Sequence, residues 1–314
     1  MTTIVSRRHF IKFYASIVFA TAFFIAMGSV LLFVYSDSIG KQKIEPKDHL
    51  MLFFSIACYL FAVYGVYRYV KNAPTITIGR DFINFNGQVF SISDINKLEL
   101  SGKRPFKYAV DFPMEAATLT FKNGDKKYIF DDMYANTWEM KLFLKQTVID
   151  KKGYFEINNL EIDKSALVND SFETFRGNQF TSLRGLSLWG LIGFFGYMLV
   201  TNNKPNGEFL IITFSCVSIF WFVVHCYLMN YFKVSDNFFV VRNHNYFWKK
   251  HIYGIRNIKE IVFETQGKMP NCLRIITNDF RSKLYPAATL RDRDWLKLKN
   301  RLEACGIEVR NECI

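Results

Sequence analysis

The residues of this chain that could perform catalysis or hold a metal ion are its histidines and cysteines. Five histidines stand at positions 9, 49, 225, 244 and 251, and the six cysteines include no Cys-x-x-Cys pair. Neither set has the ligand spacing of a zinc site, and the cysteines do not suggest a disulfide framework. The sequence also lacks glycine-rich phosphate-binding loops and nucleophile elbows. We therefore predict no catalytic residue, no metal site and no cofactor, and we expect that the protein is not an enzyme.

Pairs of acids could act as a general acid and base. Asp131-Asp132 and the pair of Asp292 and Asp294 each precede a stretch with helical periodicity. Acids at the start of a helix interact favourably with the positive end of its dipole. We interpret both pairs as helix-start residues rather than catalytic groups. His244 and His251, which flank an expected hairpin turn, are interpreted as surface residues.

His225 is the one ionisable side chain well inside an apolar stretch, residues 209–232, which contains no Asp, Glu, Lys or Arg. An ionisable group in lipid costs a few kcal/mol unless it has a partner or a purpose. His225 is therefore a candidate intramembrane polar site. A neutral histidine near the end of a span can also bond a neighbour or reach the interface, so a structural role stays open.

Four apolar stretches organise the chain around a membrane. A helix of about 20 apolar residues crosses a hydrocarbon core about 30 Å thick. Half of the residues are hydrophobic and 33 are Phe, which lipid accommodates more readily than a soluble core does. We expect glycines 185, 190, 193 and 196 to form a close-packing face between helices. We predict two transmembrane hairpins, in residues 1–71 and 184–230, with spans at 13–35, 50–67, 185–203 and 209–230.

Lysines and arginines flank the ends of these stretches that face one side of the membrane. Such residues accumulate on the cytoplasmic side, so we predict a multi-pass membrane protein with both termini in the cytoplasm. The same rule accounts for the net charge of +12 without a nucleic-acid partner. The flanking residues are Arg7, Arg8, Lys12, Arg68, Lys71, Arg176, Arg184 and Lys233.

Each predicted hairpin is followed by a soluble region, and the two regions carry their strand, turn and helix signals in the same order. These regions are residues 72–152 and 231–314, about half of the chain apart. Residues 153–183 show no clear periodicity and are predicted to be a linker. We therefore predict an internal duplication with the fold class membrane α plus α+β.

Tight turns are the clearest signals in both regions. Asn86-Gly87 and Asn123-Gly124 stand between strand-like runs, and Asn-Gly supplies the positive φ angles that a two-residue hairpin turn requires. In the second region, Asn278-Asp279 takes the place of the second pair, and residues 246–248 are predicted to form a strand. Each region is therefore expected to be a set of antiparallel strands.

A change to helical periodicity ends each soluble region. Asn136 and Thr289 are predicted to cap these helices at their N-termini. Trp138 and Trp295 occupy matching places, and we expect each ring to cover the open end of a small barrel. The expected apolar faces consist of Trp138, Leu142 and Ile149 in the first helix, and of Trp295, Leu298, Leu302 and Cys305 in the second.

Several segments carry a family resemblance. The first region contains the segment 78–83, the run Ile92-Ser93-Asp94-Ile95 leading into Leu98, the Asn123-Gly124 hairpin and the Trp138 helix, with counterparts in the second region. This pattern resembles bacterial multi-pass membrane proteins that carry pleckstrin-homology-like (PH-like) domains. The resemblance implies small antiparallel barrels, each closed by a C-terminal helix, and a location in the bacterial cytoplasmic membrane. It also implies a non-enzymatic binding or scaffolding role.

One feature of eukaryotic PH domains is not matched. Their phosphoinositide pocket is crowded with lysines and arginines at the first strand turn, whereas Gly79-Arg80-Asp81 and Ser235-Asp236-Asn237 each offer at most one cation beside an acid. The resemblance therefore does not imply recognition of inositol phosphates.

The charge of the two soluble regions differs. Residues 231–314 hold 16 Lys and Arg against 9 Asp and Glu, whereas residues 72–152 hold 12 against 10. We predict that the second region contacts anionic lipid headgroups or a cytoplasmic protein partner, although an ordinary soluble surface would have the same composition. The candidate residues are Arg242, Lys249, Lys250, Arg281 and Lys283.

Together these features predict a non-catalytic membrane protein that acts as a binding, scaffolding or regulatory module. Two alternatives stay open: a transporter or channel component that uses the helices, and an immunity-type protein against a membrane-acting toxin. The sequence does not determine the partner, the lipid or the oligomeric state.

Overall fold

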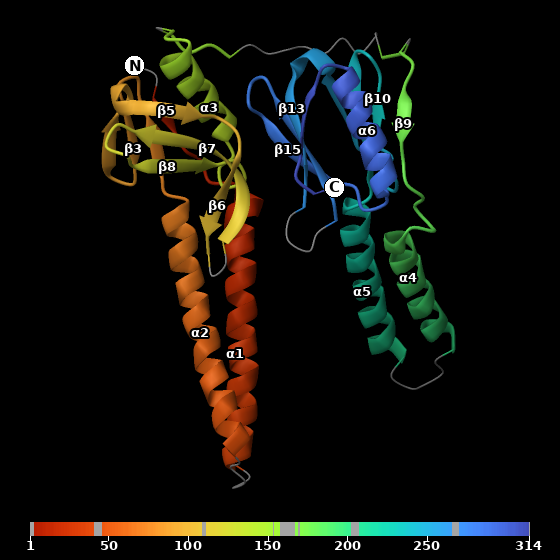
Figure 1. The fold of residues 1–314 in the computed structure, drawn as a ribbon. Helices are drawn as coiled ribbons and strands as arrows, with labels where there is room; N and C mark the ends of the chain where they lie inside the picture. The colour runs from red at the N-terminus through yellow and green to blue at the C-terminus, as the bar shows by residue number, and fades with distance from the viewer. Residues whose placement is uncertain are drawn as a thin grey trace. The chain divides into compact units, whose positions relative to one another are not determined.

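The computed structural model describes residues 3–40, 46–108, 111–152, 154–157, 167–168, 170–201, 207–265 and 270–313. The chain forms two compact units, Met1–Ile157 and Asn158–Ile314. Each unit combines a pair of helices with small, mainly antiparallel sheets, so the predicted mixture of helices and antiparallel strands is confirmed (Figure 1).

Two long helices form the hairpin of the first unit. A π-helical turn, Phe10–Ala15, leads into α1, Ser16–Gly40, and α2 is Pro46–Asn72. The two helices approach closely at Gly28, where the Ser55 hydroxyl donates a 2.8 Å hydrogen bond to the Gly28 carbonyl oxygen. A Cβ atom at Gly28 would lie 3.2 Å from the Ser55 carbonyl oxygen, so this position favours glycine.

The second unit contains α4, Leu183–Thr201, and α5, Gly207–Tyr227. Within the described residues, three helical segments are long and apolar enough to cross a membrane: Phe10–Gly40, His49–Asn72 and Leu183–Thr201. These segments correspond to three of the four predicted spans. The apolar segment Ile211–Tyr227 of α5 is shorter.

The predicted end of the fourth span is wrong. Helix α5 stops at Tyr227, and Asn230 already belongs to strand β10. Met229 forms a β-bridge with Ala287, and Phe232 is buried in the core of the β part. The uncharged run does not show where the helix gives way to a strand, because a buried strand is as apolar as a membrane helix.

The predicted close-packing face of glycines is also wrong. Apart from the chain neighbours and the nearby backbone of α4 itself, no described residue has an atom within 4 Å of a Cβ placed at Gly190, Gly193 or Gly196. Gly185 is crowded, but by the carbonyl oxygens of Gln179 and Phe180 just before its own helix.

Two sheets make up the β part of the first unit. In the first sheet, β1 precedes the helices in sequence and pairs with β2, which follows them. In the second sheet, the long strand β7 pairs with β8, while β5 and β6 pair with successive parts of it. The strands are β1 Ile4–Val5, β2 Ile76–Ile78, β3 Phe82–Phe85, β4 Gln88–Ser91, β5 Ile95–Glu99, β6 Lys103–Lys107, β7 Asp111–Phe121 and β8 Lys126–Phe130.

The Asn-Gly turns connect strands as predicted. Asn86 and Gly87 have φ angles of 48° and 95°, as a two-residue hairpin turn between β3 and β4 requires. Between β7 and β8 only Gly124 has a positive φ, 88°. In the second unit the residue with positive φ after Asn278-Asp279 is Phe280, at 64°.

The helix that ends the first unit, α3 Thr137–Leu144, differs from its prediction. Asn136 makes no side-chain cap; its amide instead accepts a 2.7 Å hydrogen bond from Arg7 N and donates one of 2.9 Å to Val5 O. It therefore attaches the N-terminal segment to the unit. Leu142 is buried as predicted, together with Met140 and Leu144, whereas Trp138 is half-buried and Ile149 is 52% exposed.

The two acid pairs have different roles. Asp131 forms a buried ion pair with Lys141, and Asp132 Oδ1 lies 2.5 Å from Lys12 Nζ. Their interpretation as helix-start residues is wrong, because α3 begins only at Thr137; the two carboxylates pair with Lys141 and Lys12 instead. Asp292 and Asp294 do lie in the first turn of α6, as predicted.

Two further sheets make up the β part of the second unit. Their strand orders are β12-β11-β10-β9 and β15-β14-β13-β16, and β16 runs parallel to β13. Strand β9 lies within residues 153–183, so this part of the predicted linker belongs to a sheet. Residues 153, 158–166 and 169 of the linker lie outside the described residues. The strands are β9 Glu173–Phe175, β10 Asn230–Val234, β11 Phe238–Asn243, β12 Lys250–Gly254, β13 Ile258–Glu264, β14 Cys272–Thr277, β15 Ser282–Pro286 and β16 Glu308–Asn311.

Helix α6, Asp292–Ala304, covers the core of the second unit. The Trp295 ring is fully buried, 4.9 Å from the ring of Phe263 and 5.9 Å from that of Phe232. Leu298 and Leu302 are also fully buried, which confirms the predicted apolar face. The predicted N-cap of α6 is wrong. The N-cap position is Arg291, whose side chain makes no capping hydrogen bond, and Thr289 Oγ1 instead lies 3.2 Å from His244 Nε2.

We expect Trp295→Ala to lower the free energy of unfolding of the second unit by about 3–5 kcal/mol, because it removes a large buried ring. Limited proteolysis of the full-length protein in detergent micelles should then cleave the second unit faster while the helices stay protected. Leu296→Ala, on the same helix but at a side chain that is 48% exposed, is the control. Equal cleavage of the two variants would show that Trp295 lies outside the core.

Candidate functional site

The junction between α5 and the β part of the second unit is a buried hydrogen-bond network. The last carbonyl groups of a helix have no partner within the helix. Asn243 Nδ2 donates to Cys226 O at 2.7 Å, and Asn230 Nδ2 donates to Tyr227 O at 3.2 Å. Asn243 Nδ2 also donates to Asn230 Oδ1 at 3.2 Å. The two buried amides therefore join the helix end directly to β10 and β11.

The same network positions the loop between β11 and β12, residues 244–249, which we call the aromatic loop. Asn243 Oδ1 accepts hydrogen bonds of 3.0 Å from the backbone N–H groups of Asn245 and Tyr246. The Tyr246 hydroxyl donates to Val223 O of α5 at 3.1 Å. Residues 246–248 were predicted to be a strand; they form a turn, because these bonds direct the backbone back toward the helix.

Three basic side chains, Lys249, His251 and Lys283, lie together where the edge strands β12 and β15 face each other; we call them the cation cluster. Lys283 Nζ is 3.3 Å from His251 Nε2. Lys249 Nζ lies 5.0 Å from the centre of the Tyr227 ring, at the end of α5. A 2.6 Å hydrogen bond between the hydroxyls of Tyr253 and Tyr285 links the two edges.

The electrostatics of the cation cluster favour a neutral imidazole. Burial lowers the pKa of His251 below its ordinary value of 6.5, and the charges of Lys283 and Lys249 lower it further. Burial also lowers the pKa of Lys249. The stabilising contribution of neutral His251 is therefore present above pH 6.5 and is lost as the pH falls through the lowered pKa. An anion bound among these groups would oppose both effects, because a nearby opposite charge favours the protonated form.

The structure separates the five cations that the sequence indicated. Lys249 and Lys283 belong to the cation cluster. Arg242 pairs with Lys250 across β11 and β12, on the opposite face from the pair of Val241 and His251. Arg281 follows the turn between β14 and β15, at the end of the unit away from α5, where Arg281 Nε lies 3.0 Å from Asp279 Oδ2.

His251 is the member of the cluster that sequence reasoning assigned to the surface. It is half-buried. One sequence signal placed His251 near Lys249: the two residues are two positions apart, and alternate residues of an extended chain share a face. Its proximity to Lys283 was not readable, because β12 and β15 belong to different sheets. His244, the other presumed surface histidine, is also half-buried, and burial lowers its pKa to about 4.

His225, the candidate intramembrane polar site, lies in the last turn of α5 and is 2% exposed. Its Nδ1 is 3.2 Å from Trp221 O, and its ring centroid is 4.0 Å from that of Trp221. Arg184 Nη1, from the start of α4, lies 3.5 Å from His225 Nε2. His225 thus has partners from both helices at the end where the β part begins.

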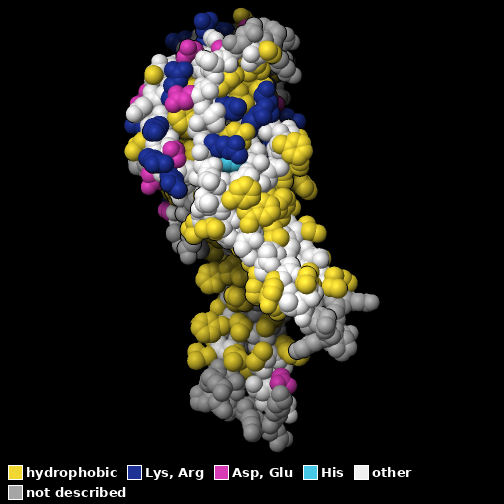
Figure 2. Space-filling model, turned by 90° about the vertical axis from the view of Figure 1, so that its right-hand side faces the viewer, with side chains coloured by type: hydrophobic (Ala, Val, Ile, Leu, Met, Phe, Trp, Pro, Cys, Tyr) yellow, Lys and Arg dark blue, Asp and Glu magenta, His cyan; other side chains and the backbone are white. Residues whose placement is uncertain are grey.

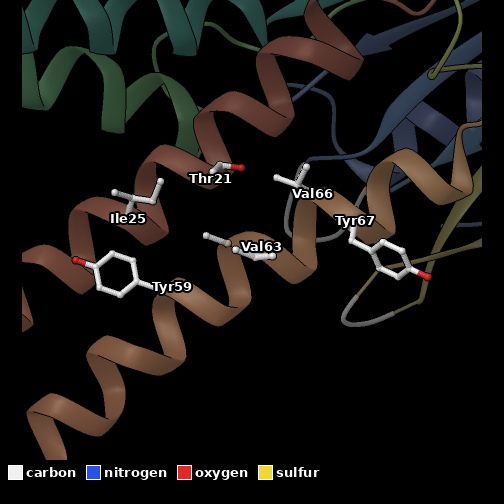
Figure 3. Close-up of a pocket in the computed structure, with 7 residues that line it drawn as sticks. Thr21, Ile25, Tyr59, Val63, Val66 and Tyr67 are labelled. Atoms are coloured by element: carbon white, nitrogen blue, oxygen red, sulfur yellow. The ribbon is translucent and has the colours of Figure 1, made fainter.

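A groove of about 460 Å³ lies between α1 and α2 in the first unit (Figure 3). Its lining is apolar apart from three hydroxyl groups, and none of the residues that form it is charged. Such a surface suits lipid chains better than a polar solute. The lining residues are Thr21, Ile25, Tyr59, Ala62, Val63, Val66 and Tyr67.

Comparison with known proteins gives no assignment: no protein-family model matches the chain, and no curated protein sequence matches it. The candidate site is therefore interpreted from its own geometry.

Replacing Asn243 tests the junction. Asn243→Ala removes the donor to Cys226 O and the acceptor for two loop N–H groups, and each buried group left unpaired costs about 1–3 kcal/mol. We expect faster hydrogen exchange in residues 244–249 and in the last turn of α5, measured by mass spectrometry. Asn300→Ala, at an exposed position of α6, should leave that exchange unchanged. Unaltered protection in Asn243→Ala would mean that the amide network does not hold the loop.

Proposed function

We propose that this chain is a non-catalytic, multi-pass membrane protein whose second unit binds the anionic headgroups of lipids through the cation cluster. The observation that carries this proposal is the grouping of His251 and Lys283 with Lys249, which lies beside Tyr227 at the end of α5. Three apolar helices long enough to cross a bilayer support the membrane location. Figure 2 supports the division of roles, since hydrophobic side chains dominate its helical part and Lys and Arg gather on the β part.

We further propose that the two units are copies of one PH-like module. The order of elements supports this. In both units a short strand precedes two helices, and three strands, a 3-10 turn, further antiparallel strands and a helix follow. In both units the strand before the helices pairs with the strand after them. The units differ in β6, which only the first has, and in β16, which only the second has, among the described residues.

The lipid proposal makes a quantitative prediction for two cations. A cation near an anionic surface contributes about 1 kcal/mol, so Lys249→Gln combined with Lys283→Gln should weaken binding by about 2 kcal/mol, or roughly 30-fold. Binding of phosphatidylglycerol to the full-length protein in detergent can be measured by native mass spectrometry. The binding should also weaken as salt rises, because counterions screen the attraction.

The matched control removes the same charge from two cations outside the cation cluster. Arg256 and Arg281 lie near the turn between β14 and β15, where Asn278 Nδ2 donates to Arg256 O at 2.8 Å. Arg256→Gln combined with Arg281→Gln should retain the lipid. If both double variants lost lipid binding equally, the binding would depend on the overall positive charge of the unit and not on the cation cluster. If both double variants retained lipid binding, and the pKa of His251 were the same in anionic and zwitterionic nanodiscs, lipid would not bind at the cation cluster. That outcome would favour an acidic protein partner.

The orientation is also a proposal: both termini and both β parts lie in the cytoplasm. The flanking Arg7, Arg8, Arg184 and Lys233 support it through the preference of such residues for the cytoplasmic side. A reporter enzyme active only outside the cytoplasm should work when inserted after residue 203 and fail when fused after residue 314. Activity of the C-terminal fusion would reverse the orientation.

A further inference from the structure

The aromatic loop presents large apolar side chains that the fold itself does not use. Phe247 and Trp248 are 80% and 69% exposed. Their ring contacts are with loop neighbours: Phe247 with Trp248 at 4.9 Å, and Tyr246 with Trp248 at 5.4 Å between centroids. The two rings therefore add little to the core of the unit, and in water their exposure is unfavourable.

The loop is held in an ordered conformation beside the helix. Lys249 N donates to Tyr246 O at 2.9 Å, which closes the turn, and His244 N donates to Met229 O at 3.0 Å. The Tyr246 hydroxyl reaches Val223 O, one helical turn before the end of α5. One turn is about 5.4 Å along the axis, so the loop extends back along the apolar helix by about that length.

The surroundings of the loop indicate what covers it. On the helix side lie Val223 and Tyr227, both 49% exposed, which continue the apolar surface of α5. On the other side the chain continues into Lys249 and Lys250. Hydrophobic side chains in Figure 2 likewise continue from the helical part to the base of the β part, where Lys and Arg begin. An apolar surface followed by aromatic rings and then by cations matches the layers of a membrane interface.

We propose that the aromatic loop is an interfacial anchor, with Phe247 and Trp248 inserted between the headgroups and the acyl chains of the leaflet in which α5 ends. The indole of Trp248 combines an apolar ring with an N–H donor, which suits that depth. The anchor acts through apolar insertion and therefore operates in uncharged bilayers, unlike the binding of anionic headgroups by the cation cluster. It rests on the membrane location proposed above.

The experiment uses the full-length protein labelled with 5-fluorotryptophan in nanodiscs of phosphatidylcholine. The Trp248 ¹⁹F signal is assigned by its loss in Trp248→Phe, with Trp248→Tyr as a second assignment variant. Two relaxation agents are compared: a lipid that carries a nitroxide near the top of its acyl chain, and a water-soluble gadolinium chelate. The lipid agent should broaden the Trp248 signal strongly, and the soluble chelate should broaden it weakly.

The chain contains its own reference signals. Trp189 lies within the apolar helix α4 and is 38% exposed, so the lipid agent should broaden it, whereas fully buried Trp295 should respond to neither agent. Broadening of Trp248 by the soluble chelate alone, with Trp189 still broadened by lipid, would overturn the anchor and leave the membrane location intact. Protection of Trp248 from both agents would overturn it in favour of a protein surface. If the lipid agent did not broaden the Trp189 signal, the membrane location itself would be rejected.

Discussion

The structure of the second unit depends on how the end of α5 satisfies its last carbonyl groups. A sheet begins at Asn230, three residues after α5 ends, so there is no linker in which water could bond these carbonyl groups. Asn230 and Asn243 supply the missing donors from the first two strands of the sheet. Because the same amides fix the aromatic loop and the start of β12, one polar network sets the helix end, the loop and part of the cation cluster.

The first unit holds its hairpin by different contacts with the same result. The Tyr134 hydroxyl donates to Pro74 O at 2.6 Å just after α2, and Arg8 Nη2 donates to Ala73 O at 3.1 Å. Strand β1 before the helices pairs with β2 after them, as β9 pairs with β10 in the second unit. Both ends of each hairpin are therefore attached to a sheet, so a displacement of the helices would be transmitted to the β part.

The cation cluster places two lysines near a half-buried histidine. Lys249 and Lys283 disfavour protonation of His251, and like charges at short range repel one another. Positive charge gathered near a helix end attracts anionic headgroups, and this attraction is the physical basis of the proposed lipid contact.

The sequence by itself determined what depends on neighbouring residues: the apolar spans within α1, α2 and α4, the Asn86-Gly87 turn and the buried face of α6. It did not determine where α5 ends, because a buried strand continues the same uncharged run. Nor could it show that Asn136 binds β1 or that Lys283 meets His251. Only the tertiary structure decided these points, because their hydrogen-bond and charge partners lie far apart in the chain and meet only when strands of different sheets come together.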